Sequence, residues 1–117
     1  MTEALIVDDD PDLCDVMREV FGMLGVARCV VAHSMTEVQG LSYIPQDVAI
    51  LDINLGRDAP SGIDVCHWLR GNDFRGRTVF LTGHAQSSPL VRKALELPNT
   101  TLLTKPVSVE RLASILP

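Results

Sequence analysis

Ala4-Leu5-Ile6-Val7-Asp8-Asp9-Asp10 is the stretch that decides the fold of this chain, because a short apolar run ends abruptly in three carboxylates. The run has the length and composition of a buried β-strand, so it would deliver the aspartates to one edge of a sheet. Carboxylates held this close together raise one another's pKa unless a cation neutralises them. The stretch therefore predicts a metal ion or a lysine partner at that edge.

Four further apolar runs follow, separated by stretches with helical spacing. The five predicted strands are residues 4–7, 27–32, 47–51, 77–81 and 100–104. These runs are apolar on both sides, which is typical of a parallel sheet covered on both faces. Five strands alternating with five helices predict a doubly wound α/β fold, and 117 residues fit one domain over residues 1–117.

Each predicted helix has a local start signal. Asp10-Pro11 is an N-cap followed by proline at the first helical position, and Gly25 ends that helix. Serine N-caps predict the starts of the other four helices at Ser34, Ser61, Ser88 (followed by Pro89) and Ser108. The first two serines are followed three residues later by an acidic residue, as in a capping box.

Composition and charge exclude several classes of function. The net charge of −5, with scattered Lys and Arg, argues against direct binding to nucleic acid. Cys14, Cys29 and Cys66 share no close spacing, so we interpret them as small buried hydrophobic residues. The chain shows neither a leader nor an apolar stretch long enough to span a membrane, and we expect a cytoplasmic protein.

Parallel strands end at one edge of their sheet, where functional groups gather in doubly wound folds. The predicted strands end in Asp8-Asp9, Asp52, Thr82 and Lys105, whereas strand 27–32 brings no polar group of this kind. Carboxylate oxygens suit Mg²⁺, with Mn²⁺ as an alternative. A carboxylate beside such an ion can attack phosphorus, and a lysine and a hydroxyl can neutralise the transferred phosphoryl oxygens.

Other candidate residues have simpler interpretations. Asp10 is expected to serve as the helix N-cap. We interpret His33 and His67 as residues on helix faces, because neither has a partner at metal-ligand spacing. Trp68 is expected to pack in the core.

In this order and at these strand ends, the residues resemble the receiver domains of two-component response regulators. The resemblance covers almost the whole chain and implies a flavodoxin-like three-layer sandwich with strand order 2-1-3-4-5. It implies that Asp9 is a direct Mg²⁺ ligand and that Asp8 holds metal-bound water. Asp52 would be the phosphoacceptor and metal ligand, and the backbone carbonyl of Asn54 would complete the metal site.

The resemblance also assigns roles at the ends of the last two strands. Thr82 matches the switch hydroxyl, and Lys105-Pro106 matches the lysine with a following proline, usually joined by a cis peptide bond. His84 lies at a position that influences how fast the acyl phosphate hydrolyses in the family. Lifetime tuning and a plain loop histidine remain equal alternatives for it.

The sequence departs from the family pattern at several positions. Gly62 comes two residues later than usual, so residues 56–60 should enlarge the loop beside Asp52. Gly83 after Thr82 should keep access to the phosphate open. Leu102 stands where an aromatic residue is common, which puts the usual relay through a rotating ring in doubt.

The resemblance to receiver domains implies that the chain takes part in a bacterial phosphorelay. It would accept a phosphoryl group from a histidine kinase or histidine phosphotransfer protein, and catalyse only its own phosphorylation and dephosphorylation. With no output domain within residues 1–117, it would signal to an unknown output protein through the fourth helix, fifth strand and fifth helix. A homodimer through the same surface is an open alternative.

Three other functions compete with this interpretation. A receiver-like scaffold would share the fold without being phosphorylated. A small Mg²⁺-dependent phosphatase would need a second acid where Asn54 stands. A flavodoxin-like nucleotide or flavin binder would need phosphate-binding amides after the first strand, where the aspartates would repel phosphate.

Overall fold

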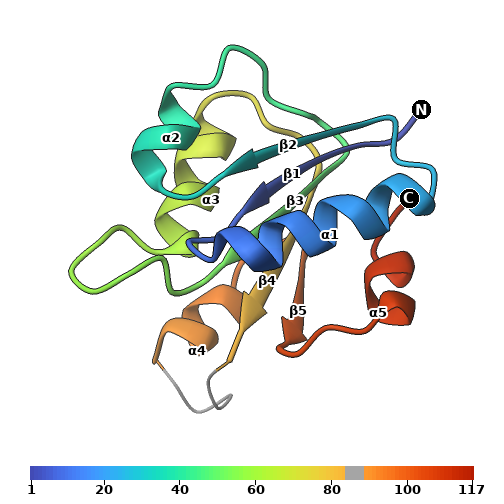
Figure 1. Cartoon of the computed structure of the whole chain (residues 1–117). Helices are drawn as coiled ribbons and strands as arrows, with labels where there is room; N and C mark the ends of the chain where they lie inside the picture. The colour runs from blue at the N-terminus through green and yellow to red at the C-terminus, as the bar shows by residue number, and fades with distance from the viewer. Residues whose placement is uncertain (84–88) are drawn as a thin grey trace.

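Five parallel strands form one central sheet in the computed structural model, which describes residues 1–83 and 89–117. The strands are β1 (Glu3–Val7), β2 (Arg28–Ala32), β3 (Val48–Asp52), β4 (Arg77–Thr82) and β5 (Thr100–Thr104). Their order is β2-β1-β3-β4-β5, and all neighbouring pairs are parallel (Figure 1). The predicted doubly wound sheet and its strand order are confirmed, and each strand boundary lies within one residue of its prediction.

Helices cover both faces of the sheet. In the described chain they are α1 (Pro11–Met23), α2 (Met35–Gln39), α3 (Gly62–Gly71), α4 (Pro89–Leu95) and α5 (Val109–Ser114). One core cluster joins α1 and α5 to the sheet, and a second joins α2, α3 and α4 to the opposite face. Successive β1 residues alternate between the two clusters, as the pleat of a strand requires. Trp68 on α3 packs against the second cluster, as predicted.

Helix α1 begins and ends where the sequence predicts. The Asp10 carboxylate accepts hydrogen bonds from the backbone N–H of Asp12 (3.0 Å) and Leu13 (3.3 Å). At the other end, Gly25 has φ 89°, and the N–H of Val26 donates to the carbonyl of Phe21 at 2.9 Å. This pattern is a Schellman motif, which glycine favours because it adopts positive φ without steric cost.

The two predicted capping boxes differ in detail. Ser61 and Asp64 make both reciprocal hydrogen bonds at the start of α3. At α2, the Ser34 hydroxyl accepts from the Glu37 N–H, but the Glu37 carboxylate accepts from His33 N–H instead of Ser34 N–H. Ser108 caps α5. The predicted cap at Ser88 lies outside the described residues, and α4 is described from Pro89 onward.

The start of α3 lies directly against the end of β3. The N–H of Gly62 donates to the carbonyl of Ile53 at 2.9 Å, and a Cβ at Gly62 would lie 2.2 Å from the carbonyl oxygen of Asp52. Only glycine allows this approach. Between the two elements, residues 53–61 form a loop that projects from the body of the domain (Figure 1).

The three cysteines are free thiols; Cys14 and Cys66 are buried as predicted, whereas Cys29 is only half-buried. Burial, followed by nearby carboxylates, raises the pKa of Cys14 to about 12, and burial raises that of Cys29 to about 11. Thiols with such pKa values are inert at neutral pH. No helix within the described ranges is long and apolar enough to cross a membrane.

Candidate functional site

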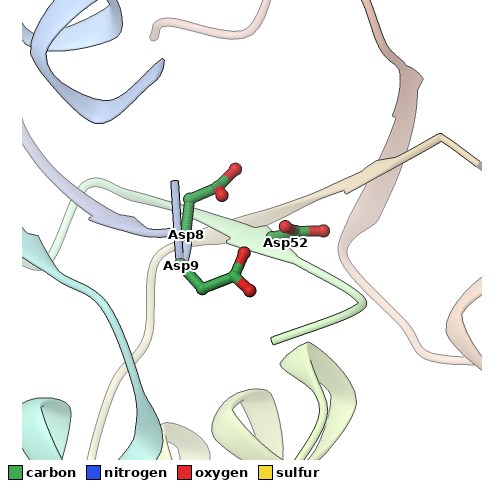
Figure 2. A group of neighbouring side chains, drawn as sticks. All are labelled: Asp8, Asp9 and Asp52. Atoms are coloured by element: carbon green, nitrogen blue, oxygen red, sulfur yellow. The ribbon is translucent and has the colours of Figure 1, made fainter. Parts of the chain in front are cut away.

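Three carboxylates meet at the carboxyl edge of the sheet, where β1 and β3 are neighbours. Asp8 and Asp9 directly follow β1, and Asp52 is the last residue of β3. One possible ligand oxygen from each residue lies within 4.8 Å of the others (Figure 2). Asp8 is completely buried and Asp52 is 5% exposed, whereas Asp9 is exposed. The sheet therefore brings together Asp9 and Asp52, which are 43 positions apart in the sequence.

Lys105 supplies the positive charge of this cluster. It directly follows β5, and its Nζ lies 3.1 Å from Asp8 Oδ2 and 3.1 Å from Asp52 Oδ2. Its backbone N–H donates to the carbonyl of Thr82 at 2.8 Å, and the Lys105–Pro106 peptide bond is cis. Within the described residues of the cluster, three carboxylates face one ammonium group, so negative charge is in excess.

The pKa values reflect this imbalance. Burial, followed by the charge of Asp8, raises the pKa of Asp52 to about 6, although Lys105 and the N–H of Asn54 oppose the shift. Burial alone would lower the pKa of Lys105, but the hydrogen bond and charge of Asp52, followed by those of Asp8, raise it. The ammonium group of Lys105 therefore stays protonated, and its positive charge neutralises only part of the negative charge of the carboxylates.

The carboxylates have the chemistry that a hard divalent cation requires. Asp8 Oδ1 accepts from Asp10 N–H at 3.0 Å, and Asp52 Oδ1 accepts from Asn54 N–H at 3.1 Å. Asp8 Oδ2 is buried, and within the described chain its polar contact is the 3.1 Å ion pair with Lys105. Oxygen donors with excess negative charge suit Mg²⁺ or Mn²⁺, so the residues present fit such an ion.

The remaining predicted residues lie around this cluster. Thr82 ends β4 next to β3 and is 1% exposed. The side-chain oxygen of Asn54 accepts from the N–H of Gly56 at 3.2 Å, which stabilises the turn after Asp52. Leu102 on β5 is half-buried and packs against the core cluster of α2, α3 and α4. His84 lies outside the described residues, so its predicted role stays a prediction.

One residue at this edge was misinterpreted from sequence. His33 does not lie on a helix face; it lies between β2 and α2, and its Nδ1 is 2.9 Å from the carbonyl oxygen of Asp8. The second strand therefore does bring a polar side chain to the carboxyl edge. The rule applied to the other strand ends could have found it, because His33 directly follows Ala32. His67 lies on α3 and is exposed, as predicted.

Solved structures of receiver domains have the same fold. A CheY-like response regulator receiver domain protein from Methanospirillum hungatei is 21% identical, with a TM-score of 0.83 over 97% of this chain and 89% of that chain. The receiver domain of NtrX from Brucella abortus is 19% identical, with a TM-score of 0.82 over 96% and 92%. A CheY-like receiver domain from Methylobacillus flagellatus is 24% identical, with a TM-score of 0.77 over 98% and 95%.

The sequence of the chain matches a known family over nearly its whole length. No curated protein matches the chain. The family model described as the response regulator receiver domain matches residues 4–117, which include every strand end discussed above. The chain belongs to the response regulator receiver domain family.

Proposed function

We propose that this chain is a phosphorelay receiver that accepts a phosphoryl group on Asp52 from a histidine kinase or histidine phosphotransfer protein. The supporting observation is the position of Lys105 Nζ, 3.1 Å from both Asp8 Oδ2 and Asp52 Oδ2, beside a carboxylate cluster that fits Mg²⁺. Asp9, Asp8, Asp52 and the backbone carbonyl of Asn54 would hold the ion. This combination serves phosphoryl transfer, which depends on positioning and charge neutralisation.

The transfer step needs an ionised Asp52. Its pKa of about 6 leaves the carboxylate mostly ionised at pH 7.5. A carboxylate oxygen attacks the phosphorus of a phosphohistidine, so an O–P bond forms as the P–N bond breaks; the bonding pair stays on the imidazole nitrogen, which takes a proton from water. Lys105 and the hydroxyl of Thr82 bind the phosphoryl oxygens. Mg²⁺, when bound, neutralises charge on the carboxylates and the phosphoryl group.

Signalling would use the surface of α4, β5 and α5. Leu90 and Leu95 on α4 and Val109 on α5 are large exposed apolar side chains there. Leu102 stands where an aromatic residue is common in the family. A rearrangement of Thr82 on phosphorylation would therefore reach α4 without the rotation of an aromatic side chain. An unknown output protein, or a second copy of the chain, would bind this surface. Residues 1–117 would act as a cytoplasmic receiver domain that catalyses only its own phosphorylation and dephosphorylation.

Phosphorylation can be tested without the native kinase. With Mg²⁺ and acetyl phosphate or phosphoramidate, we expect intact-mass spectrometry to detect one added phosphoryl group. Asp52→Ala should abolish the addition, whereas Asp15→Ala, which removes an exposed carboxylate of α1, should not. An unchanged mass of the wild-type protein would contradict the proposal and favour the unphosphorylated scaffold. Repeated release of phosphate from phosphate esters would favour the phosphatase.

Metal binding is tested separately. Asp9 is exposed, so Asp9→Ala should fold while it loses a proposed direct ligand. We expect calorimetric titration to show Mg²⁺ binding to the wild-type protein and little binding to the variant. Wild-type affinity in Asp9→Ala would show that the ligands are assigned wrongly.

A further inference from the structure

His33 is held at the carboxyl edge by both elements that flank it. Its backbone N–H donates to Glu37 Oε1 at 3.2 Å, and Ser34 next to it caps α2. The preceding residue, Ala32, accepts from the N–H of Asp8 at 3.1 Å. The histidine ring therefore approaches Asp8 from a fixed backbone, and its Nδ1 lies 2.9 Å from the Asp8 carbonyl oxygen.

This contact determines the ring nitrogen that carries a proton. A carbonyl oxygen can only accept hydrogen bonds, so Nδ1 must be protonated to contact it. Nδ1–H then cannot accept from the thiol of Cys14, whose Sγ is 3.8 Å away. Cys14 Sγ lies 3.4 Å from the same carbonyl oxygen, and because burial raises the pKa of Cys14 to about 12, the thiol keeps its proton and donates there. Two donors, one from the residue after β2 and one from α1, thus converge on one carbonyl.

The orientation of that carbonyl affects the neighbouring aspartate. The carbonyl of Asp8 and the N–H of Asp9 belong to one planar peptide unit, so fixing the carbonyl fixes the direction in which the chain enters Asp9. Asp9 is exposed, and packing restricts its side chain little. On the other side, Asp8 Oδ1 accepts from Asp10 N–H at 3.0 Å. The backbone around Asp8 therefore places the Asp9 carboxylate beside Asp52 (Figure 2).

We propose that His33 is a positioning residue of the carboxylate site: its Nδ1–H holds the Asp8–Asp9 peptide in the orientation that lets Asp8, Asp9 and Asp52 bind one divalent cation. The inference rests on the proposed function, which makes that cation Mg²⁺. His33 does not touch the ion. It acts as a hydrogen-bonded partner behind the ligands, and the loss of such a partner weakens metal binding by about 10- to 100-fold.

Three substitutions separate the Nδ1 donor from the bulk of the ring. His33→Ala removes both, and we expect the dissociation constant for Mg²⁺ to rise about tenfold. His33→Asn keeps an N–H donor at the position of Nδ1 and should restore near wild-type affinity. His33→Gln places its amide at the position of Nε2 and should behave like His33→Ala. His67→Ala, which removes an exposed histidine of α3, is the matched control and should bind Mg²⁺ normally.

A second measurement needs no variant. Long-range ¹H–¹⁵N correlation spectra of the wild-type protein distinguish the two neutral tautomers of histidine, and we expect His33 to carry its proton on Nδ1. The tautomer is set by the hydrogen bond that the ring makes, so a ring that merely fills space would not require Nδ1–H. This readout remains decisive even if a variant fails to fold.

The outcomes distinguish this inference from the proposed function. Normal Mg²⁺ binding by His33→Ala, or an Nε2–H tautomer in the wild-type protein, would overturn the role of His33 and leave the proposed function intact. Failure of His33→Asn to restore affinity lost in His33→Ala would also overturn the role of the Nδ1 donor. A wild-type protein that does not bind Mg²⁺ would overturn both.

Discussion

The two edges of the sheet use the same kinds of charged residue in opposite ways. At the amino edge, Asp47 precedes β3 and accepts a hydrogen bond from the N–H of Glu3 at 2.7 Å. The carboxylate of Glu3 in turn accepts from the hydroxyl of Tyr43, and the Arg28 guanidinium lies 4.5 Å from the centre of the Tyr43 ring. These charges are paired with complementary groups and join the starts of β1, β2 and β3.

At the carboxyl edge, Asp8 and Asp52 are buried beside exposed Asp9, and within the described cluster Lys105 is their cationic partner. The raised pKa of Asp52, to about 6, shows that burial and like charge prevail over that partner. The amino edge therefore contributes to stability, whereas the carboxyl edge costs stability until a cation binds. Four substitutions test this division.

The largest effect should come from a glycine at the carboxyl edge. Gly62→Ala places a Cβ 2.2 Å from the carbonyl oxygen of Asp52, so β3 or α3 must move. We expect a loss of about 4 kcal/mol in the free energy of unfolding, measured by urea denaturation, together with weaker Mg²⁺ binding.

Two other glycines are matched controls for that change. Gly76→Ala meets the carbonyl of Gln46 at 2.2 Å at the amino edge and should lower stability without a specific effect on Mg²⁺ affinity. Gly22→Ala in α1 meets no atom within 4 Å and should stabilise by about 0.5–1 kcal/mol. Equal stability of Gly62→Ala and wild type would contradict the close approach of α3 to Asp52.

Removal of the ammonium group should have the next largest effect. Lys105→Ala leaves Asp8 and Asp52 without their cationic partner, and we expect about 3 kcal/mol of destabilisation in EDTA at pH 8. Added Mg²⁺ should recover much of this loss. Lys93→Ala, which removes an exposed lysine of α4, should change neither the stability in EDTA nor its recovery by Mg²⁺. A Lys105→Ala variant as stable as wild type in EDTA would contradict the prediction that Lys105 stabilises the protein by neutralising Asp8 and Asp52.

Neutralising Asp52 should instead stabilise the metal-free protein. Its pKa is raised from 3.8 to about 6, so the folded state disfavours the charged form, and the wild-type protein loses stability as the pH rises through this window. We expect Asp52→Asn to be more stable by about 2 kcal/mol at pH 8 in EDTA, with the advantage fading towards pH 4.

Thermal unfolding at several pH values measures this difference. Asp73→Asn, which neutralises an exposed carboxylate near the amino edge, should show no such pH-dependent advantage. An Asp52→Asn variant less stable than wild type at pH 8 would contradict the prediction that the ionised Asp52 carboxylate destabilises the metal-free protein.

The smallest effect should come from the amino edge. Asp47→Ala removes the acceptor for the N–H of Glu3, and we expect about 1 kcal/mol of destabilisation by urea denaturation. Mg²⁺ affinity should stay at the wild-type value. A large change in Mg²⁺ affinity would show that the two edges are coupled, contrary to their separate roles in stability and metal binding.

Much of this architecture follows from local sequence. The apolar runs predicted all five strands to within one residue, because a parallel strand covered on both faces needs an uninterrupted apolar segment. The helix starts at Asp10, Ser34, Ser61 and Ser108 were also predictable, because an N-cap bonds within its own first turn. The hydrogen bond from the His33 N–H to the Glu37 carboxylate was not predictable, since neighbouring backbone donors compete for one carboxylate.

The residues that stand at the strand ends follow from the sequence alone, because the order of strands and helices along the chain sets the edge on which each strand finishes. Three contacts of the site depend on tertiary packing: Lys105 lies equally close to Asp8 and Asp52, Gly62 touches the backbone of Asp52, and His33 and Cys14 meet on the carbonyl of Asp8. Those contacts join residues far apart in the chain. Their distances depend on strand register and helix packing, which local periodicity does not specify.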